Sequence, residues 1–182
     1  MSELIDAYNE AKEFLGFGPD DVANLQSLAP VFAEKGPAIT DTFYELLGQN
    51  PATAAFIEGR VDELKATHVR WMGELFAGDY GATYFENRIR IGHVHVSIGL
   101  DPNYVEMVMS FLRTAALEAI MDAYESSKEA GEKYSSVCKI LDLDLMTINL
   151  AYQAERLDRL TKFTGMSRKL IENCIKRAAK KK

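Results

Sequence analysis

Apolar residues recur every three or four positions along most of the chain, which is the spacing of one face of an α-helix. Clusters of Gly, Pro, Asn and Asp interrupt this pattern and indicate where helices end. In the first part of the chain we predict helices over residues 3–15, from Pro19 to a break at Gly36-Pro37, from that break to Gln49, and in a short turn through Phe56. In the second part we predict helices over about 61–75, over about 83–99, from Pro102 to an interruption at Gly131, and over about 132–163. No convincing strand alternation, internal repeat or glycine-rich phosphate loop is present. The chain is therefore predicted to be all-α, with its two longest helices offering a face to a second subunit.

Size and composition narrow the class of protein. A chain of 182 residues with 47% hydrophobic residues suits one compact globular core. No apolar run approaches the roughly 18 to 20 residues that a membrane span needs, and acidic residues occupy the region where a signal peptide would be basic and then apolar. We expect a soluble, cytoplasmic protein. Cys138 and Cys174 lie far apart and form no Cys-x-x-Cys pattern, which argues against a zinc site or a redox dithiol.

Charge is distributed unevenly along the chain. The net charge is -6, but residues 167–182 hold seven Lys or Arg against the single acid Glu172, so this segment carries +6 and the rest carries -12. An acidic body does not suit nucleic acid, whose affinity depends on clustered cations that neutralise phosphates. We therefore expect no nucleic-acid partner and interpret residues 167–182 as a basic, solvated helical extension.

Two of the three histidines lie two positions apart. On a strand His93 and His95 would point the same way, as in many zinc sites, but on a helix they point about 200° apart and only one can face a given pocket. Their apolar neighbours do not distinguish them. Gly92 and Gly99 lie near His95 on either side and favour it, because a missing Cβ allows a flat prosthetic group to approach the helix. The alternative is a hydrogen-bonded structural histidine at each position.

The stretch Ile-Gly-x-x-His-Val-x-Ile-Gly-Leu-x-Pro-x-Tyr, from Ile91 to Tyr104, resembles the proximal segment of the globin domain of bacterial globin-coupled sensors, which are relatives of the protoglobins. The family's distal side is matched in the same order by Phe43-Tyr44-Glu45-Leu46-Leu47, Pro51, Phe56 and Arg70-Trp71. This resemblance covers about residues 20 to 165. It implies a globin-like fold with an extra N-terminal helix, long C-terminal helices and haem b, bound noncovalently because no Cys-x-x-Cys-His is present.

The resemblance also implies roles for particular residues. It places the proximal iron ligand at His95 and a distal hydrogen-bond donor at Tyr44. His68 departs from the family pattern, which usually has an aliphatic residue there, and we predict that His68 binds the iron opposite His95; the alternative is a histidine that only hydrogen-bonds or stays outside. Arg88 is a candidate partner of a haem propionate, although a solvated arginine is the simpler interpretation. The predicted pocket consists of Phe43, Tyr44, Phe56, Leu64, Trp71, Met72, Arg88, Ile91, Gly92, Ile98, Met107, Val108 and Phe111, with ordinary core packing as the alternative for the wall residues.

These features predict a sensor globin domain over residues 1–166, including the extra helix in 1–18, followed by a basic extension or linker over 167–182. We expect it to respond to O2, CO, NO or redox state, to form a homodimer through its long C-terminal helices, and to have no enzymatic activity of its own. An output or membrane domain beyond residue 182 is a further expectation. The alternatives are a haem enzyme, such as a nitric-oxide dioxygenase or peroxidase, and an interaction module that keeps the globin fold without haem.

Overall fold

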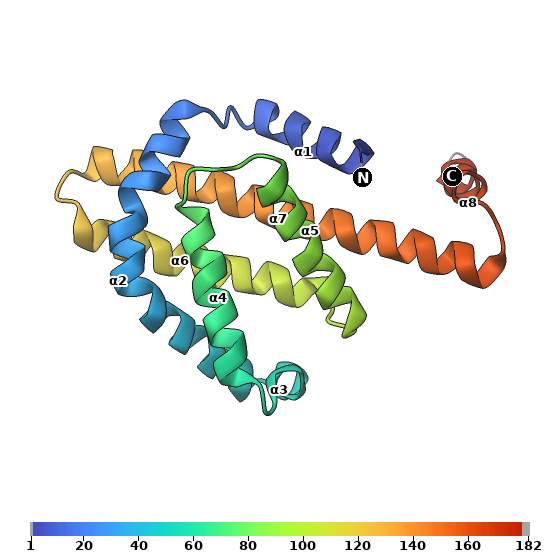
Figure 1. Cartoon of the computed structure of the whole chain (residues 1–182), viewed down its shortest axis with the longest axis horizontal. Coiled ribbons are helices and arrows are strands. Elements are labelled where there is room, and N and C mark those ends of the chain that lie inside the picture. Colours follow the sequence, from blue (N-terminus) through green and yellow to red (C-terminus); the bar gives the residue numbers. More distant parts are fainter. Residues whose placement is uncertain (1, 180–182) are drawn as a thin grey trace.

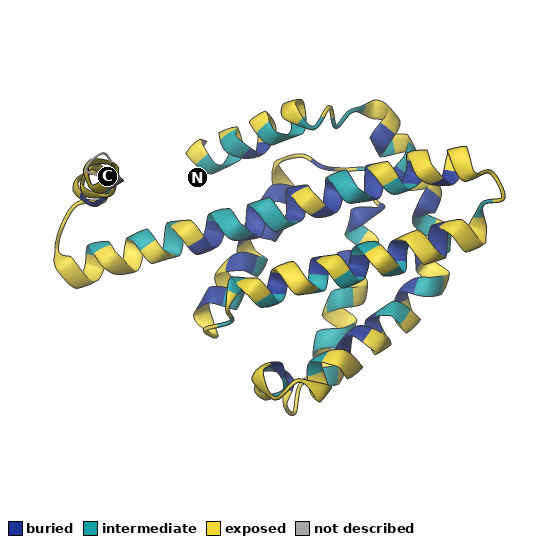
Figure 2. Cartoon of the chain, turned by 180° about the vertical axis from the view of Figure 1, so that it is seen from behind, coloured by how far each residue is buried: buried dark blue, intermediate teal, exposed yellow. Residues whose placement is uncertain are grey.

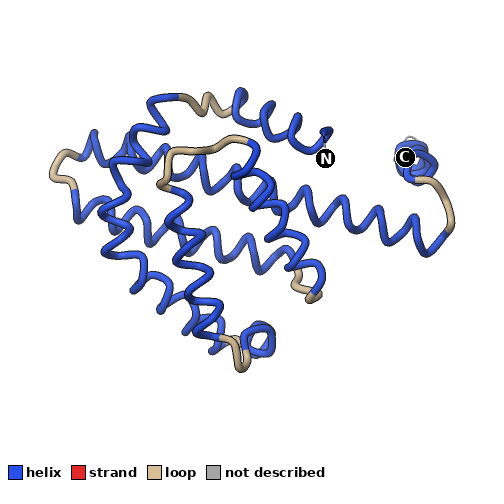
Figure 3. Tube along the Cα trace, viewed as in Figure 1, coloured by secondary structure: helices blue, strands red, loops and turns tan. Residues whose placement is uncertain are grey.

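A computed structural model of the chain describes residues 2–179. This part of the chain forms eight helices joined by short loops and contains no strand (Figures 1 and 3). The helices are α1 (Ser2–Phe14), α2 (Pro19–Gln49), α3 (Pro51–Ile57), α4 (Val61–Leu75), α5 (Ala82–Ser97), α6 (Pro102–Ala123), α7 (Ser127–Thr164) and α8 (Arg168–Ala179). None of these described helices combines the length and apolar character needed to cross a membrane. The predicted all-α class is confirmed.

Helix α2 continues through Gly36-Pro37, where the sequence predicted a break. Pro30 and Pro37 both lie inside it, and the helix curves along its length (Figure 1). An internal proline removes one backbone hydrogen bond and can kink a helix without ending it. A Cβ on Gly36 would lie only 2.8 Å from the Met72 sulfur, so this glycine permits close contact between α2 and α4. The predicted break was wrong because packing against α4 holds both halves of the helix.

The boundary between α6 and α7 also differs from the prediction. Gly131 lies within α7, and the chain turns earlier, between Ala123 and Ser127. The Ser126 hydroxyl accepts a hydrogen bond from the Glu129 amide and so caps the start of α7. The start of α6 is as predicted: the Asp101 side chain accepts from the Asn103 amide, with proline at the first helical position.

Helix α7 is the centre of the packing. Helices α1, α2, α5, α6 and α8 contact it, while α4 packs mainly across α2. Buried residues are interspersed with exposed ones along α6 and α7, as expected for helices with one inward face (Figure 2). The extra N-terminal helix α1 is fixed by Tyr8, which is buried and donates a hydrogen bond to the Tyr80 carbonyl at 3.1 Å.

The C-terminal segment leaves the body of the protein. Gly165 ends α7 in the left-handed conformation, with φ at +70°, which glycine adopts at little cost. Helix α8 follows at the far end of α7, away from the other helices in the view of Figure 1. The basic extension predicted over 167–182 is therefore helical in its described part, and Lys180, Lys181 and Lys182 lie outside the described residues.

Candidate functional site

A small apolar cluster, separate from the main core, lies where α2, α3, α4 and α6 meet. Its buried members are Phe43, Tyr44 and Ile57, and the half-buried residues packed against it are Leu47, Val61, Leu64, Val108 and Phe111. Five of these eight residues, namely Phe43, Tyr44, Leu64, Val108 and Phe111, were predicted to line one pocket. The structure therefore brings together predicted residues from three helices that are far apart in the sequence.

His68 lies at the edge of this cluster, on α4. Its ring centroid is 4.9 Å from that of Phe43 and 5.1 Å from that of Trp71. Its Nδ1 is 2.9 Å from the hydroxyl oxygen of the buried Thr40, whereas its Nε2 is buried and has no hydrogen-bond partner among residues 2–179. Burial lowers the pKa of His68 to about 4, so the ring is neutral at pH 7. If Nδ1 carries the proton and donates to Thr40, Nε2 presents a free lone pair.

His95 has a similar environment on α5. The residue is half-buried, and its Nδ1 is buried without a hydrogen-bond partner in the described part of the chain. Burial lowers the pKa of His95 to about 4, which keeps this ring neutral as well. His93, by contrast, is exposed. This difference separates two histidines that the apolar pattern of the sequence left equivalent.

An unpartnered nitrogen in a buried position costs free energy, and a neutral imidazole is the form that binds metals. Within residues 2–179 no group of three His, Cys, Asp or Glu side chains gathers as a site for a bare metal ion. Haem needs fewer protein ligands, because the porphyrin supplies four nitrogens and leaves only axial positions to be filled. His68 and His95 lie on separate helices, and each neutral imidazole has an orphaned buried nitrogen, so each residue could fill one axial position.

Tyr44 presents its ring edge to His68, with the ring centroids 6.2 Å apart. Burial raises the pKa of Tyr44 to about 12, so its hydroxyl is protonated at neutral pH. A protonated phenol can donate a hydrogen bond to an acceptor near His68. This chemistry is consistent with the donor role that the family resemblance implied.

Other predicted pocket residues are not members of this small cluster, although Trp71 lies beside His68. Trp71 and Met72 belong to the main core, Ile91 packs against that core, and Phe56 is half-buried on α3. Met72 lines a cavity of about 20 Å³ beside Gly36 rather than the small cluster. The structure leaves Ile98 and Met107 exposed and does not bring them to the cluster.

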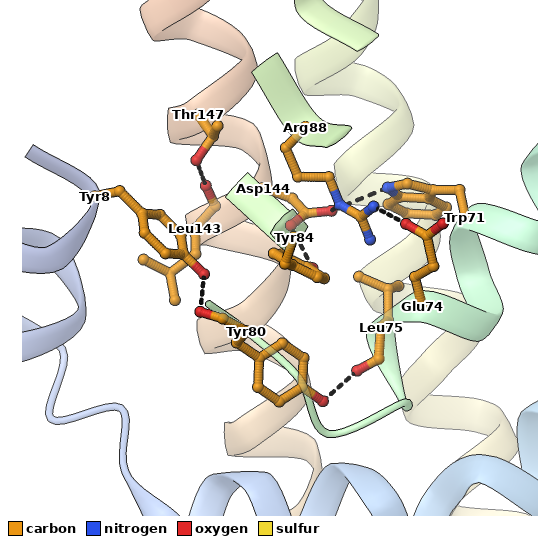
Figure 4. Close-up of polar contacts among 10 residues, drawn as sticks. All are labelled: Tyr8, Trp71, Glu74, Leu75, Tyr80, Tyr84, Arg88, Leu143, Asp144 and Thr147. Atoms are coloured by element: carbon orange, nitrogen blue, oxygen red, sulfur yellow. Dashed lines mark hydrogen bonds and ion pairs between the residues drawn. The ribbon is translucent and has the colours of Figure 1, made fainter. Parts of the chain in front are cut away.

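Arg88 requires a correction. Its side chain is buried, with 0% of the residue exposed, and Nε donates to an Asp144 carboxylate oxygen at 2.8 Å while Nη1 pairs with Glu74 (Figure 4). A guanidinium enclosed between two carboxylates of its own chain is not placed to bind a haem propionate. The sequence showed neither the burial of Arg88 nor these partners, which favour a structural role for Arg88 over contact with a haem propionate.

Asp144 is the centre of this buried polar network, which sequence reasoning missed. It accepts hydrogen bonds from the Trp71 indole at 2.9 Å and from the Tyr84 hydroxyl at 2.5 Å in addition to Arg88 (Figure 4). Burial raises the pKa of Asp144, whereas Arg88 and these donors lower it. An acidic residue within the apolar pattern of the last long helix was the signal available in the sequence. The network connects α4, α5 and α7.

Gly92 also has a different role from the one predicted. A Cβ at this position would lie 2.5 Å from the Ala151 Cβ and 2.9 Å from the Ile148 carbonyl oxygen, both on α7. The missing side chain therefore allows α5 and α7 to approach closely and does not make room for a flat group. Gly99 has φ at +72° just after α5, and no atom lies near its missing Cβ, so its role is conformational.

Comparisons with known proteins agree with this architecture. Residues 6–158 match the Protoglobin family. Over 112 residues, 60% of this chain and 23% of the relative, the sequence is 29% identical to the heme-based aerotactic transducer HemAT of Halobacterium salinarum, so the chain spans less than a quarter of that protein. The globin domain of the Geobacter sulfurreducens globin-coupled sensor is 34% identical, with a TM-score of 0.76 over 79% of this chain and 96% of that one. The chain belongs to the protoglobin family, as a globin domain similar to those of globin-coupled sensors.

Proposed function

We propose that this chain is a haem-based sensor domain that holds haem b noncovalently, with His95 as the proximal iron ligand and His68 as the distal one. The observation that carries the proposal is the pair of neutral imidazoles, each with a buried nitrogen that has no partner. The exposure of His93 supports His95 as the proximal residue. Family membership and the similarity to two haem- or globin-based sensors support the same function.

Haem, when bound, would supply an iron that can bind O2, CO or NO. The residues of the chain determine access to that iron. Thr40 orients the His68 ring through a hydrogen-bond contact, so the ring that would hold the iron on this side is already fixed in place. If the ligated form outweighs the open form by about tenfold to a hundredfold, the apparent affinity for gas falls by the same factor. Tyr44, protonated beside His68, is the proposed donor to a bound diatomic ligand.

Signalling is proposed to pass through a homodimer formed by α6 and α7. Met107, Leu117 and Met121 are exposed on α6 and, with the small side chains of Ser110 and Thr114, follow the alternating three- and four-residue spacing of a helix-packing seam. Met107, first predicted as a pocket wall, fits this seam better. The similarity to a transducer and a sensor favours sensing over haem-based turnover. We further propose that an output domain receives the signal and that the protein is cytoplasmic.

Absorption spectra of the purified, hemin-supplied chain test the ligand assignments. We expect a Soret band and a low-spin ferric spectrum that becomes high-spin in His68→Ala. His95→Ala should weaken haem retention, and the matched control His93→Ala should leave both properties unchanged. CO should bind ferrous His68→Ala about tenfold to a hundredfold more tightly than the parent chain.

Four outcomes would each contradict a defined part of the proposal. A high-spin ferric spectrum unaffected by His68→Ala would refute distal ligation. Haem retained after His95→Ala but lost after His93→Ala would reverse the proximal assignment. A chain that stays colourless with hemin would refute haem binding itself, and turnover of NO or peroxide with added reductant would favour an enzyme.

A further inference from the structure

Helix α8 separates apolar from charged residues more clearly than the other helices do. At 100° per residue, one half of its circumference carries apolar side chains and the other half carries polar and charged ones. The apolar half consists of Leu170, Ile171, Cys174, Ile175 and Ala178, and the polar half consists of Arg168, Lys169, Glu172, Asn173, Lys176 and Arg177. This is the pattern of a helix that lies at a boundary between water and an apolar phase.

Most of the apolar half has no cover in the structure. Ile171 is buried, in keeping with the packing of α8 on α7, but Leu170 and Ile175 are 47% and 57% exposed. The residues just before α8 add to the exposed apolar surface, since Phe163 is 91% exposed and Met166 is also exposed. Large apolar side chains gathered over such a short segment indicate an interaction site.

The charge of this segment identifies the chemistry of the partner. Residues 167–182 carry +6 by sequence, whereas the rest of the chain carries -12. A basic, amphipathic helix is attracted by a surface that is anionic outside and apolar beneath. An anionic lipid bilayer has both properties and would repel the acidic body, so that the chain would attach by this end alone. Helix α8 stands at the far end of α7, where the body does not obstruct such contact (Figure 1).

We propose that α8, with the apolar residues before it, binds in the plane of an anionic membrane surface. Two observations favour a bilayer over a second copy of the chain. The apolar arc of α8 covers about half of its circumference, wider than the seam of two positions in seven that a coiled coil uses. Helix α6 already presents such a narrow exposed seam for a second copy. The proposal does not depend on haem binding.

Sedimentation with lipid vesicles tests this proposal on the full chain. We expect binding to vesicles of phosphatidylglycerol mixed with phosphatidylcholine and little binding to phosphatidylcholine alone. Binding should weaken at about 0.5 M salt, because the electrostatic screening length then falls to a few ångströms. The double variant Leu170→Glu/Ile175→Glu should lose binding. Lys169→Gln/Lys176→Gln should bind about 25-fold more weakly, at about fivefold for each positive charge removed.

A matched control distinguishes a local effect from a general one. Leu46 on α2 is 47% exposed, as Leu170 is, so Leu46→Glu places the same charge on a similar surface residue outside α8 and should leave binding intact. A fluorophore on the exposed Cys174, with Cys138 replaced by serine, should report a less polar environment when vesicles are added. Circular dichroism verifies that each variant is folded.

Several results would overturn the proposal. Failure of the folded parent chain to bind phosphatidylglycerol vesicles would do so, as would equal binding by Leu170→Glu/Ile175→Glu. If that variant instead converted a dimer into a monomer, as measured by light scattering, the apolar half of α8 would be a contact between two copies. If the chain bound nucleic acid and Leu170→Glu/Ile175→Glu did not weaken that binding, α8 would act through its positive charge alone and the proposed membrane contact would be refuted.

Discussion

Replacing Asp144 with alanine tests the buried polar network that joins α4, α5 and α7. Asp144 is fully buried and accepts hydrogen bonds from Arg88, Trp71 and Tyr84. Its removal leaves two neutral donors without an acceptor and leaves the buried Arg88 paired only with Glu74 at the edge of the network. Breaking a buried ion pair by removing one partner typically costs about 3 to 5 kcal/mol. We expect a loss of this size, which lowers the melting temperature by roughly 6 to 20 °C for a chain of this length.

Urea unfolding followed by circular dichroism measures the loss, and the same helix provides a control. Asp142 lies two residues earlier and forms an ion pair with Arg113 at the surface. An exposed ion pair contributes about 0 to 1 kcal/mol, so Asp142→Ala should be nearly neutral. A loss below about 1 kcal/mol for Asp144→Ala, or equal losses for both variants, would refute the view that a buried charge organises this region.

Further predictions concern a glycine contact and the two buried histidines. Gly92→Ala places a methyl group 2.5 Å from the Ala151 Cβ and should lower the free energy of unfolding in urea by about 1 to 3 kcal/mol. The control Gly131→Ala, with no described atom within 4 Å, should raise it by about 0.5 to 1 kcal/mol. The opposite order would refute the packing role of Gly92. In the haem-free chain, burial lowers the pKa of His68 and His95 to about 4, whereas the unfolded value is about 6.5. The stability that each neutral ring contributes is therefore complete above about pH 6.5 and is lost as the pH falls toward about 4. When the pH falls from 7 to 4.5, the free energy of unfolding of His68→Leu should therefore drop by about 2 to 3 kcal/mol less than that of the parent chain. Equal drops for the two chains in urea titrations would contradict burial of His68 in the folded state.

The sequence predicted local features better than contacts between distant segments. The start of α6 at Pro102 and the interval between α4 and α5 were predictable because short-range chemistry determines them. The break at Gly36-Pro37 was wrong because contact with Met72, 36 residues later, decides whether the helix continues. Turn-forming residues therefore indicate where a helix can end, while tertiary packing determines whether it does.

The candidate site shows the same division. Helix geometry restricted His93 and His95 to opposite sides, which agrees with the exposure of His93 and the partial burial of His95. Thr40, which fixes the His68 ring, lies 28 residues earlier and no local pattern connects the two. Gly92 was misinterpreted because a missing Cβ suits a flat group and a neighbouring helix equally well, and only the position of α7 distinguishes them.

The polar network also gives the two proposed iron ligands a physical connection. The Trp71 ring packs beside His68, and its indole nitrogen donates to Asp144 on α7. Asp144 in turn binds Arg88 on α5, the helix that carries His95. We expect that displacement of His68 by a gas would change the packing beside Trp71, and that this change would reach α5 and α7 through the Asp144 carboxylate. Because both helices would then respond to the same event, Asp144→Ala should alter CO affinity as well as stability. The control Asp142→Ala should alter neither. A CO affinity unchanged by Asp144→Ala would show that displacement of His68 stays local to α4.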